Sequence, residues 1–141
     1  MNYFLAKTDP ETYSLADLKK EQQTNWDGVH NYTAIATIKS WKPGDLILIY
    51  HSQDERRIVG LAKVMGEPEF DANDKKGISW MAKVAFVREF SEEQKITLKE
   101  IKETGMFDDF ALVRLGRLST MPCPPEFITW LKKKNLDLSA A

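Results

Sequence analysis

The stretch that organises this chain is Asn25-Trp26-Asp27-Gly28-Val29-His30-Asn31-Tyr32. Asp27-Gly28 is strong turn chemistry, because glycine accepts a positive φ and aspartate hydrogen-bonds its own backbone. Asn31 is a good N-cap, since its side-chain oxygen can accept an unsatisfied amide of a following helix. Trp26 and Tyr32 are therefore expected on or beside a tight loop that leads into a helix. Trp26 is then either a lid over the hydrophobic core or a wall on which a flat ligand such as a nucleobase stacks.

Apolar spacing on both sides of this stretch predicts short strands and helices. Tyr32, Ile35 and Ile38 recur at near-helical spacing, which predicts a helix that stops before the turn at Pro43-Gly44. A capping box at Ser14 and Asp17, and another at Thr97 and Glu100, predict two further helix starts. A C-terminal helix is expected after Pro125, with Phe127, Ile128 and Leu131 on one face. The expected strands are Tyr3–Lys7, Leu46–Tyr50, Arg57–Val64, Trp80–Phe86 and Arg117–Ser119.

Strands that are joined by turns and flanked by helices predict the α+β class, with a small, curved sheet or barrel. Glu21 to Thr24 is expected to be a polar connector, and Glu67 to Gly77 a polar loop. Gly60 lies inside an expected strand, which predicts a bulge or a close backbone approach. The pattern of Met106–Leu115 assigns no element. The length of 141 residues suits a single domain over residues 1–141.

Composition narrows the classes of function. The net charge is −1 and the isoelectric point about 6.1. This argues against a broad, non-specific nucleic-acid binder, which is normally basic, but leaves room for a local basic rim. The single cysteine, Cys123, excludes an internal disulfide and fits a reducing compartment. We expect no signal peptide and a cytoplasmic location, and no stretch is apolar enough to span a bilayer, so no membrane partner is expected.

The sequence gives little support for a hydrolytic site or a metal site. His51 and Ser52 are adjacent, and neighbours on a strand point to opposite faces, so they would not pair as base and nucleophile. No Gly-x-Ser-x-Gly elbow and no glycine-rich phosphate loop is present. His30, His51 and Cys123 lack the paired spacings that build a zinc site. We therefore expect neither a bound metal nor a cofactor.

Polar and aromatic residues at expected strand ends and loops form the candidate binding set, because binding residues concentrate there. Each has a simpler structural interpretation as well. Tyr50 is explained as a core residue with its hydroxyl satisfied, His51 as a partner of a neighbouring backbone group, and Arg117 as a partner of a carboxylate. The set comprises Lys7, Thr8, Trp26, His30, Asn31, Tyr32, Tyr50, His51, Ser52, Arg117 and Ser119. From these residues alone, the chain is an α+β domain with a candidate pocket for a planar ligand.

Four further motifs occur along the chain: Lys7-Thr8-Asp9-Pro10, Trp26-Asp27-Gly28-Val29-His30-Asn31-Tyr32, Pro43-Gly44-Asp45 and Tyr50-His51-Ser52. Taken together, they resemble motifs of the EVE domain family over nearly the whole chain. Gly60, Trp80 and Arg117-Leu118-Ser119 fall in the expected order. The resemblance implies a PUA-like fold, a strongly curved β-barrel of five or six strands with surrounding helices. It also implies kinship with YTH domains, which hold a methylated base in an aromatic cage, and with ASCH domains, some of which are enzymes.

The chain departs from the family pattern at basic positions. His30 stands where the family usually has arginine. The run Thr33-Ala34-Ile35-Ala36-Thr37-Ile38-Lys39 replaces Gln-Ala-Arg-Asn-Phe-Leu-Arg, so an Arg-Asn pair is lost. Such residues are natural phosphate contacts, and their loss agrees with the near-neutral net charge. The loop before Trp80 is also short.

The resemblance supports two hypotheses. In the first, the chain is a non-catalytic module whose partner is nucleic acid carrying a modified cytosine or adenine, in DNA or alternatively in RNA. Trp26 would stack on a flipped-out base, with Tyr50 or Tyr32 as another wall. Thr8, Asn31 and Ser52 would bond the base edge, and Lys7, His30 and Arg117 would meet phosphate or an exocyclic oxygen.

In the second hypothesis, the chain is an ASCH-like amidohydrolase of a modified nucleoside. Lys7 would act as a base of lowered pKa and Thr8 as nucleophile or water-positioner, with Asp9 as the nearest carboxylate. We favour the non-catalytic module, because the sequence contains no strong catalytic constellation.

Overall fold

The structure, a computed structural model, describes residues 1–140. Its helices are α1 (Leu15–Glu21), α2 (Tyr32–Ser40), α3 (Leu98–Glu103), α4 (Ala111–Arg114) and α5 (Pro125–Lys133). Its strands are β1 (Tyr3–Thr8), β2 (Gln23–Trp26), β3 (Leu46–His51), β4 (Arg57–Val64), β5 (Glu69–Phe70), β6 (Trp80–Glu89), β7 (Ile96–Thr97) and β8 (Thr120–Pro122).

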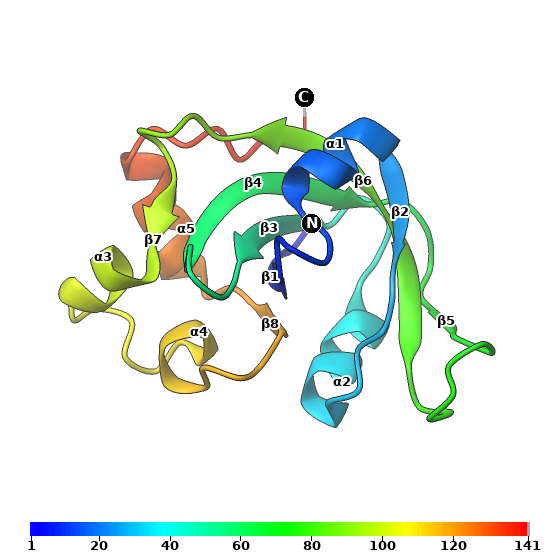
Figure 1. Ribbon diagram of the computed structural model, residues 1–141. Helices are drawn as coiled ribbons and strands as arrows, with labels where there is room; N and C mark the ends of the chain where they lie inside the picture. Colours follow the sequence, from blue (N-terminus) through cyan, green and yellow to red (C-terminus); the bar gives the residue numbers. More distant parts are fainter. Residues whose placement is uncertain (141) are drawn as a thin grey trace.

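Six strands form one sheet in the order β2-β6-β4-β3-β1-β8. β1 and β3 run parallel, and the other pairs in this path are antiparallel. β5 adds to β6, and β7 adds to β4. The sheet curls into a half-barrel with the helices around it (Figure 1), which confirms the PUA-like α+β architecture. None of the helices in residues 1–140 is long and apolar enough to cross a membrane.

The central strand β3 is buried along its whole length, as its continuous apolar run predicts. Because successive side chains of a strand point to opposite faces, β3 contributes to two core clusters. Leu46 and Leu48 pack into the cluster that also holds the buried residues of α3, α4 and α5. Ile47 and Ile49 pack into the cluster that holds those of α1, together with Trp26 and Trp41. The sheet is therefore covered on both faces.

Gly60 confirms the prediction of a close approach in β4. A Cβ atom built there would lie 2.5 Å from a methyl carbon of Leu15 and 2.6 Å from the carbonyl oxygen of Arg88. Only glycine lets α1 and β6 come this close to β4. The strand pairing with β3 also shifts register between Ile49 and Tyr50, opposite this position. α1 is thereby held against the sheet beside the candidate pocket.

The helix caps agree with the sequence. The Ser14 hydroxyl accepts from the Asp17 amide at 3.1 Å, and the Asp17 carboxylate accepts from the Ser14 amide at 2.9 Å. Asn31 Oδ1 accepts from the Ala34 amide at 3.0 Å. Thr97 Oγ1 accepts from the Glu100 amide at 3.1 Å. Three of the helix starts are therefore fixed by local side-chain chemistry.

Two predicted segments are wrong. The segment Glu21–Thr24 is not a polar connector: Glu21 ends α1, and residues 23–24 begin the edge strand β2, which pairs with β6 and ends at Trp26. Its side chains are exposed or half-buried apart from Trp26, so no apolar alternation announces it. Residues 117–119 are not a strand. The Leu118 amide donates to the Leu115 carbonyl at 3.0 Å, which makes a turn, and β8 begins only at Thr120. The short elements α4, β5 and β7 were not predicted.

Candidate functional site

A cavity of about 660 Å³, the β1–β2 cavity, lies beside the ends of β1 and β2. Because β1 ends at Thr8 and β2 at Trp26, the sheet delivers both strand ends to one place. The loop from Asp27 to Asn31 completes the rim before α2 starts. Six of the eleven predicted residues line this cavity: Lys7, Thr8, Trp26, His30, Asn31 and Ser119. The sequence had not singled out for binding the other lining residues Asp9, Thr12, Tyr13, Thr24, Asn25, Asp27, Gly28 and Val29.

Two aromatic residues line the cavity. Trp26 is only 8% exposed and belongs to the core cluster on the α1 side of the sheet, so it serves the core and the cavity together. Tyr13 packs against the same cluster, and its hydroxyl donates to the Glu21 carboxylate. Burial and this hydrogen bond raise the pKa of Tyr13 to about 12, so the phenol is neutral at physiological pH. The cavity therefore has an aromatic wall of uncharged side chains.

Lys7 and Thr8 bind backbone groups rather than one another. Lys7 Nζ donates to the Gly116 carbonyl at 2.9 Å and lies 5.5 Å from the centroid of the Tyr50 ring. Burial lowers the pKa of Lys7. Thr8 Oγ1 donates to the Tyr13 carbonyl at 2.6 Å. The pair thus fixes the walls of the cavity: Lys7 holds the turn before β8, and Thr8 holds the segment before α1.

His30 connects the cavity rim to the loop that precedes Trp80. Its Nε2 lies 2.6 Å from Asp74 Oδ1. The other Asp74 oxygen accepts from the amides of Ile78 at 3.0 Å and Ser79 at 2.9 Å. The His30 hydrogen bond and these amides hold the pKa of Asp74 well below its usual range. His30 is therefore engaged with a carboxylate from its own chain.

Asp27 and Asn31 present polar atoms to the cavity. Burial, and then the neighbouring Asp71 carboxylate, raise the pKa of Asp27. Asn31 uses Oδ1 to cap α2. Its Nδ2 forms no hydrogen bond with any residue in the described part of the chain and remains a donor for a ligand. Asp27 and Asn31 therefore offer the cavity a carboxylate acceptor and an amide donor.

Three predicted residues at the end of β3 lie outside the cavity lining, and each has a structural role. Tyr50 is buried in the core beneath Lys7. His51 Nε2 accepts from the Leu15 amide at 3.0 Å, and its Nδ1 lies 2.8 Å from Glu55 Oε2. The histidine thus satisfies an otherwise unpaired amide at the start of α1. Ser52 donates through both its amide and its hydroxyl to the Thr8 carbonyl, at 2.9 and 3.2 Å.

Tyr32 and Arg117 also lie outside the lining, but close to it. Tyr32 follows the capping Asn31 and is 73% exposed, so it points into solvent rather than forming a pocket wall. Arg117 is exposed and lines a neighbouring cavity of about 340 Å³, which shares Asn31 with the β1–β2 cavity.

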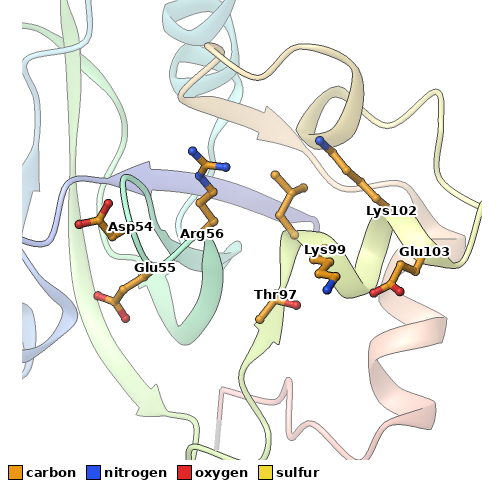
Figure 2. A pocket seen from close by; sticks show the side chains of 8 residues that line it. Asp54, Glu55, Arg56, Thr97, Lys99, Lys102 and Glu103 are labelled. Atoms are coloured by element: carbon orange, nitrogen blue, oxygen red, sulfur yellow. The ribbon is translucent and has the colours of Figure 1, made fainter.

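A third cavity of about 640 Å³, the hairpin cavity, lies between the β3–β4 turn and α3. Its lining carries three cations and three carboxylates and no aromatic residue. Within residues 1–140, its cations form no ion pair. Figure 2 shows Asp54, Glu55 and Arg56 on the hairpin side and Lys99, Lys102 and Glu103 on the α3 side.

None of the three cavities offers a metal site. Among residues 1–140, no group of three or more His, Cys, Asp or Glu side chains is placed to hold a metal ion.

Comparison with known proteins places the chain among relatives of this architecture. A model of the EVE domain matches residues 2–134. Thymocyte nuclear protein 1 of Gallus gallus is 30% identical over 158 residues, which cover 88% of this chain but only 64% of that protein. The Homo sapiens protein of that name is 30% identical over 95% of this chain and 75% of its own length.

Two solved structures extend the comparison. The human THYN1 protein, solved in complex with 5-methylcytosine-containing DNA, superposes with a TM-score of 0.81 at 27% identity and covers 97% of this chain and 99% of its own. The MmI1 YTH domain superposes with a TM-score of 0.56 at 14% identity, covering 96% of each chain, which is a likeness of fold alone.

Proposed function

Because this chain belongs to the EVE domain family, we propose that it is a non-catalytic DNA-binding protein that holds a modified cytosine in the β1–β2 cavity. One observation carries the proposal. The cavity combines Tyr13 and Trp26 with the Asp27 carboxylate and the free Asn31 amide on a rim fixed by strand ends. Its volume of about 660 Å³ falls within the usual range for small-ligand pockets. The human relative's complex with 5-methylcytosine-containing DNA supports cytosine as the base.

Recognition would combine aromatic contact with hydrogen bonds to the base edge. Cytosine presents an exocyclic amino donor beside ring and carbonyl acceptors, and aspartate is suited to accept from that amino group. We assign this role to Asp27 and the complementary donor role to Asn31 Nδ2. The 5-methyl group would lie against the apolar surface of Tyr13 and Trp26. Extruding a base costs a few kcal/mol, which these contacts would return.

The electrostatics predict specific rather than general binding to DNA. His30 is paired with Asp74, and Lys7 is held by the Gly116 carbonyl and the Tyr50 ring. The family's Arg-Asn pair after Tyr32 is absent. Few cations therefore remain at the cavity for phosphate, and we expect affinity to depend only weakly on salt.

The amidohydrolase alternative is less well supported. It requires Thr8 to be activated as a nucleophile, but its hydroxyl donates to the Tyr13 carbonyl. Lys7 and Thr8 are consecutive in β1 and point to opposite faces. Asp9 Oδ1 accepts from the Glu11 amide at 2.9 Å. These contacts give no nucleophile–base pair.

A binding titration tests the proposal. Single-stranded and duplex oligonucleotides would carry cytosine, 5-methylcytosine or N6-methyladenine at one position in an otherwise constant sequence. We expect 5-methylcytosine to bind most tightly, with the strand recovered unchanged. Equal affinity for all three bases would contradict base recognition. Release of ammonia from 5-methylcytosine, or of methylamine from N6-methyladenine, would restore the enzyme hypothesis.

A further inference from the structure

We propose that the cavity between the start of α2 and the turn before β8 binds the nucleotide next to the modified base in the same strand. We call it the flank cavity, and it is lined by Asn31, Thr33, Leu115, Gly116, Arg117 and Leu118. The inference rests on the proposed function, because it needs a modified base in the β1–β2 cavity.

The flank cavity and the β1–β2 cavity lie side by side, because they share residues that are common to both linings or adjacent in sequence. Asn31 lines both of them. Ser119 of the β1–β2 cavity follows Leu118 of the flank cavity directly in sequence. The bond from Lys7 Nζ to the Gly116 carbonyl, 2.9 Å long, crosses from one lining to the other. A single strand seated in the first cavity would therefore have its next nucleotide at the second.

The lining chemistry suits a nucleotide. Arg117 is the sole charged side chain among the six lining residues, so the flank cavity is cationic. By contrast, the hairpin cavity mixes three cations with three carboxylates. Leu115 is 46% exposed and supplies apolar surface for a base. The Thr33 hydroxyl forms no hydrogen bond within residues 1–140, so it is free to meet a base edge. Apolar surface, one cation and a free hydroxyl match the base, the phosphate and the polar edge of one nucleotide.

The turn that carries these groups is held in place before any ligand binds. The Leu115 amide donates to the Ala111 carbonyl at 2.8 Å, and the Leu118 amide donates to the Leu115 carbonyl at 3.0 Å. Leu118 itself is buried in the core. With the Lys7 bond to Gly116, the turn is fixed from three sides. A single exposed leucine is ordinary on a protein surface, but one on a fixed turn beside a cationic cavity is preorganised for contact.

Gly116 allows a clean test. A Cβ atom at this position meets no atom within 4 Å, and the residue does not have a positive φ. Gly116→Leu therefore adds a side chain at the flank cavity without strain in the free protein. Gly66 has the same two properties and lines none of the cavities described above, so Gly66→Leu is the matched control. Arg117→Ala removes the cation, with Lys102→Ala of the hairpin cavity as its control for charge.

The probes are single-stranded DNA trinucleotides with a central 5-methylcytosine. Each flanking position carries either a normal nucleotide or an abasic one, and the same set is made with unmethylated cytosine. For the natural protein, we expect an abasic site on one side to weaken binding about tenfold, as for the loss of apolar contact between one base and a leucine side chain. Gly116→Leu should bind the intact strand as weakly as the natural protein binds the abasic one, and Arg117→Ala should fall in between. Gly66→Leu and Lys102→Ala should still bind the intact strand about tenfold more tightly than the abasic one.

The outcomes separate the two proposals. If an abasic site on either side leaves affinity unchanged while methylated strands still bind better, the flank cavity is not a subsite and the proposed function stands. The flank cavity is likewise not a subsite if Gly116→Leu, folded as judged by its melting temperature, still binds the intact strand more tightly than the abasic one. If methylated and unmethylated strands bind equally, the proposed function fails and the inference falls with it.

Discussion

The β1–β2 cavity and the hairpin cavity have nearly the same volume, about 660 and 640 Å³, but they are built differently. The first is bounded by strand ends, by two aromatic side chains and by polar groups that backbone hydrogen bonds hold in place. The second is bounded by charged side chains of opposite sign, which are exposed except for the half-buried Glu55. Long charged side chains lose conformational freedom when a ligand orders them. Volume alone therefore does not identify a binding site, whereas preorganised polar and aromatic groups do.

The largest expected difference between the two cavities is in how much a truncated side chain at each one lowers the free energy of unfolding. Trp26 is almost fully buried, so Trp26→Ala should lower the free energy of unfolding by about 3–5 kcal/mol, as for other truncated core tryptophans. Leu98→Ala in the hairpin cavity removes a half-buried side chain and should cost about 1 kcal/mol. Urea unfolding of both variants measures the contrast.

Trp26→Phe separates the two roles of this residue. It keeps an aromatic face in the cavity while losing less core volume, so binding to methylated DNA should survive in part. Unchanged affinity per folded molecule in Trp26→Ala would remove Trp26 from the binding site and leave it as a core residue alone.

A second contrast concerns hydrogen bonding to the base. Asp27→Asn replaces a pure acceptor by an amide of the same shape at the β1–β2 cavity. Affinity for 5-methylcytosine DNA should fall about tenfold, within the range for one base-edge contact. The same change at Asp54 in the hairpin cavity should leave affinity unaltered. Isothermal titration of both variants measures the contrast, and unchanged affinity in Asp27→Asn would mean that the Asp27 carboxylate does not accept a hydrogen bond from the base.

The sequence predicted the parts of the fold that depend on local chemistry. Caps at Ser14, Asn31 and Thr97 were correct because each is made within one turn of chain. The buried strand β3 was correct because both of its faces are apolar. The edge strand β2 was missed because its pairing with β6, far along the chain, is what makes it a strand. A polar edge strand has no signal in a window of a few residues.

The residues of the candidate site were also predicted only in part from the sequence. The motif at the end of the first strand led to Lys7 and Thr8, and the turn motif before α2 led to Trp26, and these three residues do line the cavity. Tyr50-His51-Ser52 is an equally evident motif, but the structure uses it to join β3 to α1 and β1. Tyr13 was missed because its place before the Ser14 cap is that of an ordinary hydrophobic staple. A motif therefore marks residues that the fold needs in place, and only the assembled structure shows which of them face a ligand.

A smaller effect on stability is expected from the hydrogen bond between His30 and Asp74 at the rim of the β1–β2 cavity. The pKa of Asp74 in the folded protein lies below its ordinary value of 3.8. A depressed carboxyl pKa stabilises the fold above the unfolded value, and this contribution is lost as the pH falls through the folded-state pKa. Asp74→Asn should therefore destabilise the protein at pH 7 and do so less at pH 3. Urea unfolding at both pH values measures this change. Asp54→Asn, an exposed carboxylate of the hairpin cavity, is the control and should shift stability by less than about 0.5 kcal/mol at either pH.

The smallest effect is expected from the hairpin cavity itself, where Lys99 and Lys102 project from α3 (Figure 2). The double variant Lys99→Ala, Lys102→Ala should change the free energy of unfolding by less than about 0.5 kcal/mol, because both side chains are exposed and neither forms an ion pair within residues 1–140.

The binding of methylated single-stranded DNA by this double variant is the sharper measurement. Each phosphate contact contributes about 0.7 to the slope of log affinity against log salt for single strands. If the hairpin cavity lies outside the DNA path, the slope for the double variant equals that of the natural protein. A slope lower by about 1.4 would mean that both lysines meet phosphate. The strand would then cross the β3–β4 hairpin, and the two cavities would be parts of one DNA-binding surface rather than a binding site and an unrelated hollow.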